Sequence, residues 1–182
     1  MPECEDLSGI EISELTTRAE KTANEVIIKL KKHSLTLVLA ESCTAGLVSG
    51  LLANISGASA VLWGSYVCYK QEAKVSMLDL DNDRLNMFGL VSCETASSMA
   101  ESALNKSGVS LAASVTGLAG SESDGRVPGG TIWIATANHD TGIQVKEYLF
   151  SGDRNAVRKR AAIAVLESIL EKISLIVKDY QI

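Results

Sequence analysis

The apolar positions of this 182-residue chain follow two spacings, one typical of helices and one typical of buried strands. After an acidic lead-in over residues 1–10, apolar residues recur every three or four positions along residues 12–33, which predicts a long first helix. The same spacing along residues 157–173 predicts a final helix with one buried face. Between these two segments, short apolar runs are bounded by glycine, serine and asparagine, as expected of strands.

The short runs predict a sheet of five strands. Four of them carry β-branched, aromatic or small residues, and the other is a run of leucine and valine. They cover residues 35–39, 61–69, 110–115, 131–137 and 143–150. The last two flank a short polar turn and predict a hairpin. Further helices are expected up to Asn54 and from Cys93 to Lys106, the latter capped by Ser92. We therefore expect one three-layer α/β/α domain with a mixed sheet over residues 11–182.

Charge and composition exclude several classes of protein. With 17 basic and 22 acidic side chains the net charge is −5, which offers no basic surface to a nucleic acid or an anionic membrane. No apolar run approaches the roughly 18 residues of a membrane span, and the acidic N-terminus lacks the features of a secretory signal, so a cytoplasmic protein is expected. The four cysteines form no CxxC pair and only two histidines are present, which argues against disulfides and a metal site.

The polar cluster after residues 35–39 is the first candidate site. Residues 41–44 are of the types that begin helices, so Ser42 is predicted at a strand-to-helix turn. The first amides of a helix have no partner within the helix and can bind an anion or a carbonyl oxygen. A serine in such a cluster is more often a simple cap than a nucleophile, and Cys43 is an alternative nucleophile at the same helix start.

Tyr69 and Lys74 form the second candidate group. Tyr69 ends a predicted strand, and the good helix formers that follow place Lys74 one to two turns further along a short helical segment. Composition alone favours a solvated helix face for this lysine.

Arg154 and Arg158 lie near the predicted start of the final helix, where the helix dipole disfavours a cation unless it faces an anion. An ordinary surface arginine explains them equally well. His33 and His139 are interpreted as a helix-end residue and a hairpin-turn residue without a chemical role. The loop over residues 121–130 is rich in the residues that interrupt regular structure, which is typical of a mobile or ligand-covering segment.

Seven short motifs, taken together and in this order, resemble the CinA C-terminal domain family, the nicotinamide-nucleotide amidohydrolases. They are AESCTAG at 40–46, GASA at 57–60, the segment 69–74, VS at 91–92, TGLAG at 116–120, PGGT at 128–131 and GDR at 152–154. The resemblance extends from about Leu15 to Ile173 and looks like the stand-alone form of this domain.

The resemblance implies hydrolysis of the carboxamide of nicotinamide mononucleotide to nicotinate mononucleotide and ammonia, with no cofactor. It implies Ser42 as nucleophile, assisted by Tyr69 and Lys74 instead of a histidine. A desolvated lysine suits this role because burial disfavours its charged form, and helix-start amides would stabilise the oxyanion. The expected neighbours of the nucleotide are Thr44, Ala45, Gly46, Thr116, Gly117 and Arg154. The partner is then a small nucleotide, and the implied assembly is a homodimer.

The chain departs from the family pattern at four places. Ala45 stands for the first glycine of the usual ESCTGG, Lys70 for a small residue, Gln71 for an asparagine, and SESD at 121–124 for a glycine-rich GPGG run. Acidic side chains at 122 and 124 would repel a phosphate if their loop closed over it. The alternative function is therefore an inactive or re-targeted paralogue that binds a nucleotide without hydrolysing it.

Overall fold

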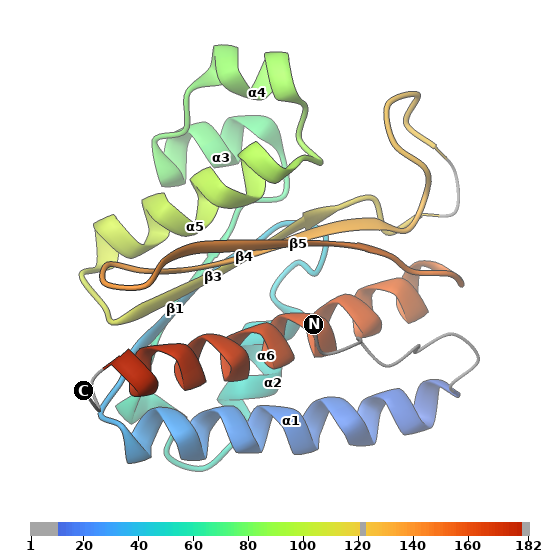
Figure 1. The fold of residues 1–182 in the computed structure, drawn as a ribbon. Helices are drawn as coiled ribbons and strands as arrows, with labels where there is room; N and C mark the ends of the chain where they lie inside the picture. The colour runs from blue at the N-terminus through green and yellow to red at the C-terminus, as the bar shows by residue number, and fades with distance from the viewer. Residues whose placement is uncertain (1–10, 121–122, 180–182) are drawn as a thin grey trace.

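A central sheet lies between two layers of helices in the computed structural model, which describes residues 11–120 and 123–179 (Figure 1). The predicted lead-in over residues 1–10 lies outside the described residues. The elements in chain order are α1 (Ile12–Lys32), β1 (Leu37–Glu41), α2 (Leu47–Ala53), the 3-10 helix η1 (Ala58–Ala60), β2 (Leu62–Val67), α3 (Gln71–Leu78), α4 (Asn82–Phe88), α5 (Cys93–Ser107), β3 (Leu111–Gly117), β4 (Thr131–Asn138), β5 (Gly142–Leu149) and α6 (Arg154–Asp179). Helices α1, α2 and α6 cover one face and α3, α4 and α5 the other, which confirms the predicted three-layer fold.

The five strands are ordered β2-β1-β3-β4-β5. β1 runs parallel to β2 and β3, whereas β4 is antiparallel to β3 and β5, so the sheet is mixed as predicted. Glu41 at the end of β1 pairs with Val67 of β2 and with Val115 of β3. Because parallel strands end at the same edge of a sheet, the segments that follow these strands start side by side.

β1 is buried on both faces, which explains why it reads as a continuous apolar run. Leu37 and Leu39 belong to the core shared with α1 and α6, while Val38 and Ala40 belong to the core under α5. The predicted apolar face of α6 is buried in the first of these cores: Val157, Ala161, Val165, Ile169 and Ile173. Burial of each large aliphatic side chain contributes roughly 1.5–3 kcal/mol, so this face holds α6 against the sheet.

The structure differs from the sequence prediction at one helix and at several element boundaries. α4 was not predicted, because Leu85 is its one buried residue and gives no apolar period, although Asp81 caps the helix by accepting hydrogen bonds from the amides of Asp83 and Arg84. β3 extends through Gly117, beyond its predicted end at Val115, because this segment pairs with β4. α2 begins at Leu47 and not directly after Ser42.

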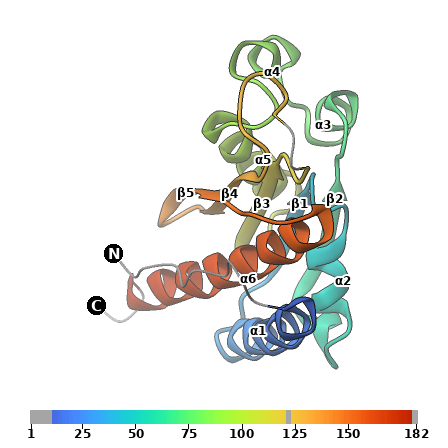
Figure 2. The ribbon, with the colours of Figure 1, turned by 90° about the vertical axis from the view of Figure 1, so that its right-hand side faces the viewer.

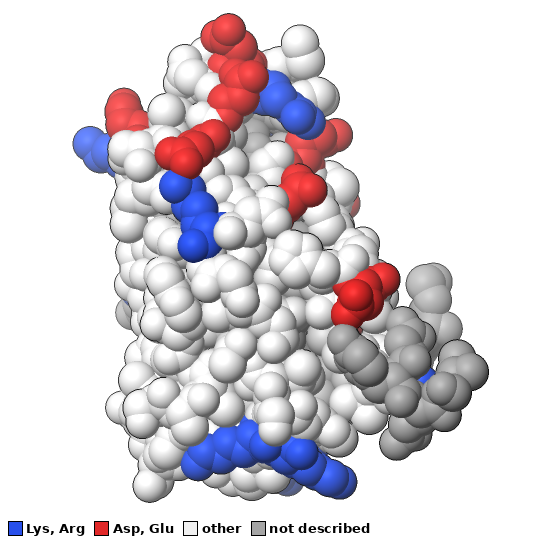
Figure 3. Space-filling model, turned by 90° about the vertical axis from the view of Figure 1, so that its left-hand side faces the viewer, with Lys and Arg blue, Asp and Glu red and all other residues white. Residues whose placement is uncertain are grey.

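The face at the amino ends of the parallel strands carries its charged side chains mainly towards its two ends (Figure 3). The last turn of α1 contains Lys29, Lys31 and Lys32, and Lys106 in the last turn of α5 pairs with Asp79. No described helix is both long enough and apolar enough to cross a bilayer. The polar side chains of the predicted site lie at the opposite, carboxyl edge of the parallel strands.

The cap of α5 gives a direct test of the fold. The Ser92 hydroxyl accepts a hydrogen bond from the Thr95 amide at 3.1 Å, so Ser92→Ala should lower the free energy of unfolding by about 1 kcal/mol. Ser97→Ala on the same helix is the matched control, because its hydroxyl bonds only the Cys93 carbonyl oxygen within the helix, and it should change stability by less than about 0.5 kcal/mol. Urea unfolding measures both, and equal losses would contradict the assigned cap.

Candidate functional site

Ser42 and Lys74 meet at the carboxyl edge of β1. Ser42 is the first residue after this strand, and its amide donates to the Val115 carbonyl oxygen of β3 at 2.9 Å. Lys74, the fourth residue of α3, donates from Nζ to Ser42 Oγ at 2.9 Å and to the Cys68 carbonyl oxygen at 2.9 Å. The structure thus brings together two residues that are 32 positions apart in the sequence.

Lys74 is buried, with 1% of its surface exposed, and Ser42 is 6% exposed. Burial lowers the pKa of the Lys74 amine below its ordinary value of 10.5, because removal from water disfavours the charged form. Both hydrogen-bond partners of Nζ are neutral groups. The solvated helix face that composition favoured for Lys74 is therefore wrong, and the lysine has the environment of a proton acceptor.

The residues after Ser42 form a turn rather than the start of a helix. Ala45 and Gly46 both have left-handed backbone angles, with φ of +51° and +89°. Glycine adopts this region freely, whereas an alanine pays about 1–2 kcal/mol, so the departure from the family pattern at Ala45 adds backbone strain to the turn.

Glu41 holds this turn from the inside. Its buried carboxylate accepts hydrogen bonds from the Thr44 hydroxyl at 2.8 Å and from the Ser65 hydroxyl at 3.2 Å. It also accepts from the first amides of α2, those of Val48 at 3.1 Å and Ser49 at 2.9 Å. The expectation that the helix-start amides would receive an oxyanion is corrected here, because the protein's own carboxylate occupies these two.

Arg158 holds the same turn from the outside. Its Nη2 donates to the Thr44 carbonyl oxygen at 2.6 Å, so this arginine faces a backbone carbonyl and not the anion that its place near the helix start suggested. Asp153 caps α6 as predicted, accepting from the Ala156 amide at 2.8 Å.

Cys43 is the weaker candidate nucleophile at this turn. Its side chain is 5% exposed, and burial raises the pKa of its thiol to about 12. A thiol with this pKa is almost entirely protonated at neutral pH, while the thiolate is the nucleophilic form.

Tyr69 and Arg154 form a pair at the mouth of the site. Tyr69 lies between β2 and α3, is 54% exposed, and accepts a hydrogen bond on its hydroxyl from Arg154 Nη1 at 3.5 Å. Arg154 is exposed at the first position of α6 and also lies beside Gly120, where an added Cβ would be 3.5 Å from Nη2. The structure therefore joins Tyr69 to Arg154, whereas Lys74 is joined to Ser42.

The other residues expected beside a nucleotide differ in access. Thr44 and Thr116 are buried, and their hydroxyls are engaged with Glu41 and with the Leu90 carbonyl oxygen. Gly117 packs closely against β4, because a Cβ added at this position would lie 2.6 Å from the Thr131 carbonyl oxygen. Ala45 is exposed and Gly46 half-buried, so these two line the open side of the turn.

Two of the departures from the family pattern have local structural roles. The Gln71 side-chain amide donates to Asn82 Oδ1 at 2.9 Å and to Asn86 Oδ1 at 2.8 Å, which ties α3 to α4. Asp124 accepts from the amides of Arg126 and Val127, and these hydrogen bonds lower the pKa of its carboxyl.

Residues 123–130, part of the segment expected to be mobile or ligand-covering, lie beside α4 in Figure 2, where Arg126 donates to the Asn86 carbonyl oxygen at 3.5 Å. Residue 122 lies outside the described residues.

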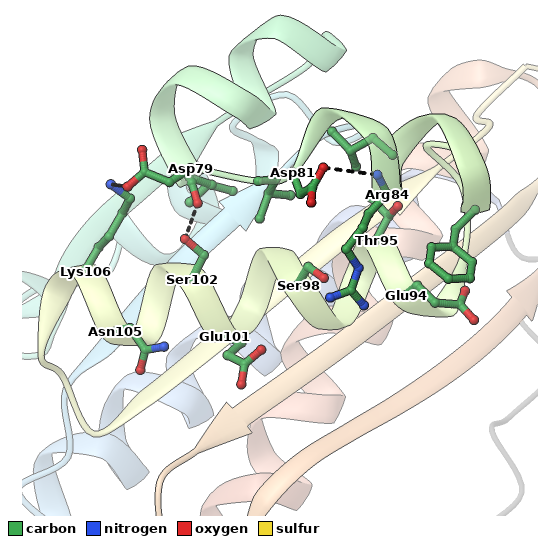
Figure 4. Close-up of a pocket in the computed structure, with 14 residues that line it drawn as sticks. Asp79, Asp81, Arg84, Glu94, Thr95, Ser98, Glu101, Ser102, Asn105 and Lys106 are labelled. Atoms are coloured by element: carbon green, nitrogen blue, oxygen red, sulfur yellow. Dashed lines mark hydrogen bonds and ion pairs between the residues drawn. The ribbon is translucent and has the colours of Figure 1, made fainter.

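A separate hollow of about 460 Å³ lies between α5 and the segment joining α3 to α4 (Figure 4). Several of its polar side chains have partners within the protein: Asp79 pairs with Lys106 at 2.5 Å, Asp81 caps α4, and Ser102 donates to the Leu78 carbonyl oxygen. Within residues 11–120 and 123–179, no group of three or more His, Cys, Asp or Glu side chains is placed to hold a metal ion. The candidate active site is therefore the edge that carries Ser42 and Lys74.

Relatives with known sequences match most of this chain. A protein of Desulforamulus reducens, named a competence-damage inducible protein, is 41% identical over 148 residues, covering 81% of this chain and 36% of the relative. A CinA-like protein of Thermotoga neapolitana is 37% identical over 153 residues, covering 82% of this chain and 36% of the relative. This chain thus spans about a third of the length of the first curated relatives that it matches.

Solved structures share the fold along most of the described chain. The competence/damage inducible protein CihA of Agrobacterium tumefaciens superposes with a TM-score of 0.81 at 33% identity, covering 85% of this chain and 94% of that protein. A CinA superfamily protein of Klebsiella pneumoniae gives a TM-score of 0.82 at 26% identity, covering 86% and 98%. The family model described as the CinA C-terminal domain matches residues 19–173, and the chain belongs to this family.

Proposed function

We propose that this protein is a serine amidohydrolase that converts nicotinamide mononucleotide to nicotinate mononucleotide and ammonia. The observation that supports a serine mechanism best is the 2.9 Å hydrogen bond between the buried Lys74 amine and Ser42 Oγ. A serine needs a neighbouring base, and a lysine whose pKa is lowered by burial is such a base. The substrate follows from the resemblance of the motifs to the nicotinamide-nucleotide amidohydrolases.

In the first half of the reaction, Ser42 Oγ attacks the carboxamide carbon while its proton passes to neutral Lys74 Nζ. The tetrahedral intermediate then collapses, the C–N bond breaks, and the departing nitrogen takes the proton from Lys74 and leaves as ammonia. The product of this half-reaction is an ester between Ser42 and the nicotinoyl group.

In the second half, Lys74 accepts a proton from a water molecule as this water attacks the ester carbon. Collapse of the second intermediate breaks the bond to Oγ, and the proton returns from Nζ to Ser42. The amides of Val48 and Ser49 are bonded to Glu41, so the donors that stabilise the two oxyanions are other groups. The resemblance to the family implies that Tyr69 assists, and its side chain is half exposed next to Arg154.

The alternative is a paralogue that binds the nucleotide without hydrolysing it. One observation favours it: the Tyr69 hydroxyl lies against Arg154, so only one of the two proposed helpers contacts Ser42. Binding of nicotinamide mononucleotide without release of ammonia distinguishes this alternative from the amidohydrolase.

Replacing the nucleophile is the first test. Ser42→Ala should lower ammonia release from nicotinamide mononucleotide by at least about 10³-fold, because no other group forms the ester. Cys43→Ala, the adjacent matched control, should retain turnover within roughly threefold, since its buried thiol stays protonated. The reverse pattern would contradict the serine mechanism and support a thiolate.

The protonation of Lys74 has a consequence for stability. Because the pKa of Lys74 is lowered on folding, the unfolded chain binds more protons between that lowered value and 10.5. The free energy of unfolding of the wild type should therefore rise with pH across this window relative to Lys74→Met, with a slope of up to about 1.4 kcal/mol per pH unit. Denaturant unfolding of both proteins from neutral pH to 10.5 measures the difference. A difference that does not vary with pH would refute a lowered pKa.

Recognition of the phosphate is tested at Arg154. A charge-assisted bond to the phosphate would help hold the remote carboxamide in place, so Arg154→Ala should weaken kcat/KM on the nucleotide by roughly 1.5–3 kcal/mol. The dephosphorylated riboside is the matched control substrate, and its slower hydrolysis should change little. Equal losses on both substrates would assign Arg154 to the structure or to the amide end of the site.

A further inference from the structure

The turn that carries Ser42 depends on contacts from outside its own sequence. Residues 42–46 contain two consecutive left-handed residues, Ala45 and Gly46, and α2 starts only at Leu47. Within the turn, the Ala45 amide donates to the Ser42 carbonyl oxygen at 3.0 Å and the Leu47 amide to the Thr44 carbonyl oxygen at 3.2 Å. Two further bonds tie the turn to the sheet, from the Ser42 amide to the Val115 carbonyl oxygen and from the Thr44 hydroxyl to Glu41, and neither of them holds the Thr44 carbonyl group.

Arg158 adds a long-range contact that holds the Thr44 carbonyl group from α6. Its side chain reaches from α6 to the Thr44 carbonyl oxygen, with Nη2 at 2.6 Å, and so links residues 114 positions apart. A hydrogen bond from a guanidinium is shorter and stronger than one between neutral groups. The carbonyl that it holds is two residues beyond the Ser42 side chain.

The Nε atom of Arg158 indicates that the contact with Thr44 is kept at a cost in stability. This atom is buried and has no hydrogen-bond partner among the described residues. Buried polar atoms without a partner are rare in folded proteins and destabilise them, so such an atom calls for a reason other than stability. The arginine has no free anion to face at this point, since its Nη2 is directed at a backbone carbonyl.

Lys74 cannot follow a displaced turn. Its amine is held by the Cys68 carbonyl oxygen as well as by Ser42 Oγ, and its stem is packed in the interior. If the Thr44 carbonyl moved, Ser42 Oγ would move away from a base that stays where it is. A misplacement of about 1 Å is enough to lower a reaction rate roughly 10²-fold.

We propose that Arg158 is a positioning residue for the nucleophile: by holding the Thr44 carbonyl oxygen, it keeps Ser42 Oγ within hydrogen-bond distance of Lys74. The inference rests on Ser42 being the nucleophile of the proposed function, but it does not depend on the substrate. Arg158 contacts no reacting atom in this role and acts through the backbone of the turn.

The test measures the reactivity of Ser42 with a fluorophosphonate, which needs no knowledge of the substrate. Ser42 Oγ forms a bond to phosphorus, the P–F bond breaks, the proton passes to Lys74, and fluoride leaves. Mass spectrometry of the intact protein and its peptides gives the labelling rate at Ser42. The proteins compared are the wild type, Arg158→Met and Arg158→Lys, each shown by circular dichroism to be folded at the assay temperature.

Lys172→Met is the matched control. Lys172 is a buried cation on the same helix that also donates to backbone carbonyl oxygens, those of Thr141 at 3.1 Å and Gly142 at 2.8 Å, at the hairpin between β4 and β5. Its loss perturbs α6 in a comparable way without touching the Ser42 turn. We expect Arg158→Met to label roughly 10- to 100-fold more slowly than the wild type, Lys172→Met within twofold of it, and Arg158→Lys between the two.

The inference is overturned if Arg158→Met labels at the wild-type rate, if Lys172→Met loses as much as Arg158→Met, or if Ser42 of the wild type does not react at all. A wild type that labels at Ser42 yet releases no ammonia from nicotinamide mononucleotide would contradict the proposed function, while the ranking of the variants would still support the role of Arg158.

Discussion

An amine buried beside a serine hydroxyl is the constraint on which the rest of this structure depends. A lysine taken out of water loses the hydration of its charged form, and Lys74 has only a hydroxyl and a carbonyl oxygen to replace it. Burial therefore shifts the protonation equilibrium of this amine towards its neutral form. The cost of placing it there is offset by the two apolar cores on either side of β1. The sheet supplies the geometry, since parallel strands bring the segments after β1 and β2 to the same edge.

The turn between β1 and α2, which carries Ser42, is held in place by contacts from the elements around it. Its left-handed residues are unfavourable by themselves, and the contacts that compensate come from the strand before it, from β2 and from α6. The Glu41 carboxylate fixes the start of α2 by accepting hydrogen bonds from two of its first amides, so these amides do not bind a ligand. The turn is thus rigid on its buried side and open only at Ala45 and Gly46.

The fold could be predicted from the sequence because most of its helices and strands have clear local patterns of apolar and capping residues. The α6 stripe, the Ser92 and Asp153 caps and the hairpin of β4 and β5 are local signals, and the structure confirms each of them. α4 escaped prediction because its single buried residue gives no period.

The site was harder to predict, because the roles of its residues came from resemblance while their environments depend on tertiary contacts. The sequence next to Lys74 does not show that this lysine is buried, and the sequence next to Ser42 does not show which residues hold its turn. Glu41 was seen only as part of a capping cluster, and the carbonyl that Arg158 meets is 114 positions away. An acidic residue directly after a short apolar run is the one local signal that could have identified Glu41.

The account rests on burial lowering the pKa of Lys74 beside Ser42 in the folded protein, and the lysine itself can report on this. With ¹³C-labelled lysine, the ε-methylene signal of Lys74, assigned by its absence from Lys74→Met, changes shift when the amine loses its proton. The account predicts a titration midpoint below the ordinary value of 10.5 in the native protein and a return to that value after denaturation. A native midpoint at or above 10.5 would mean that Lys74 is a cation at neutral pH, and the proposed base of the reaction would be lost.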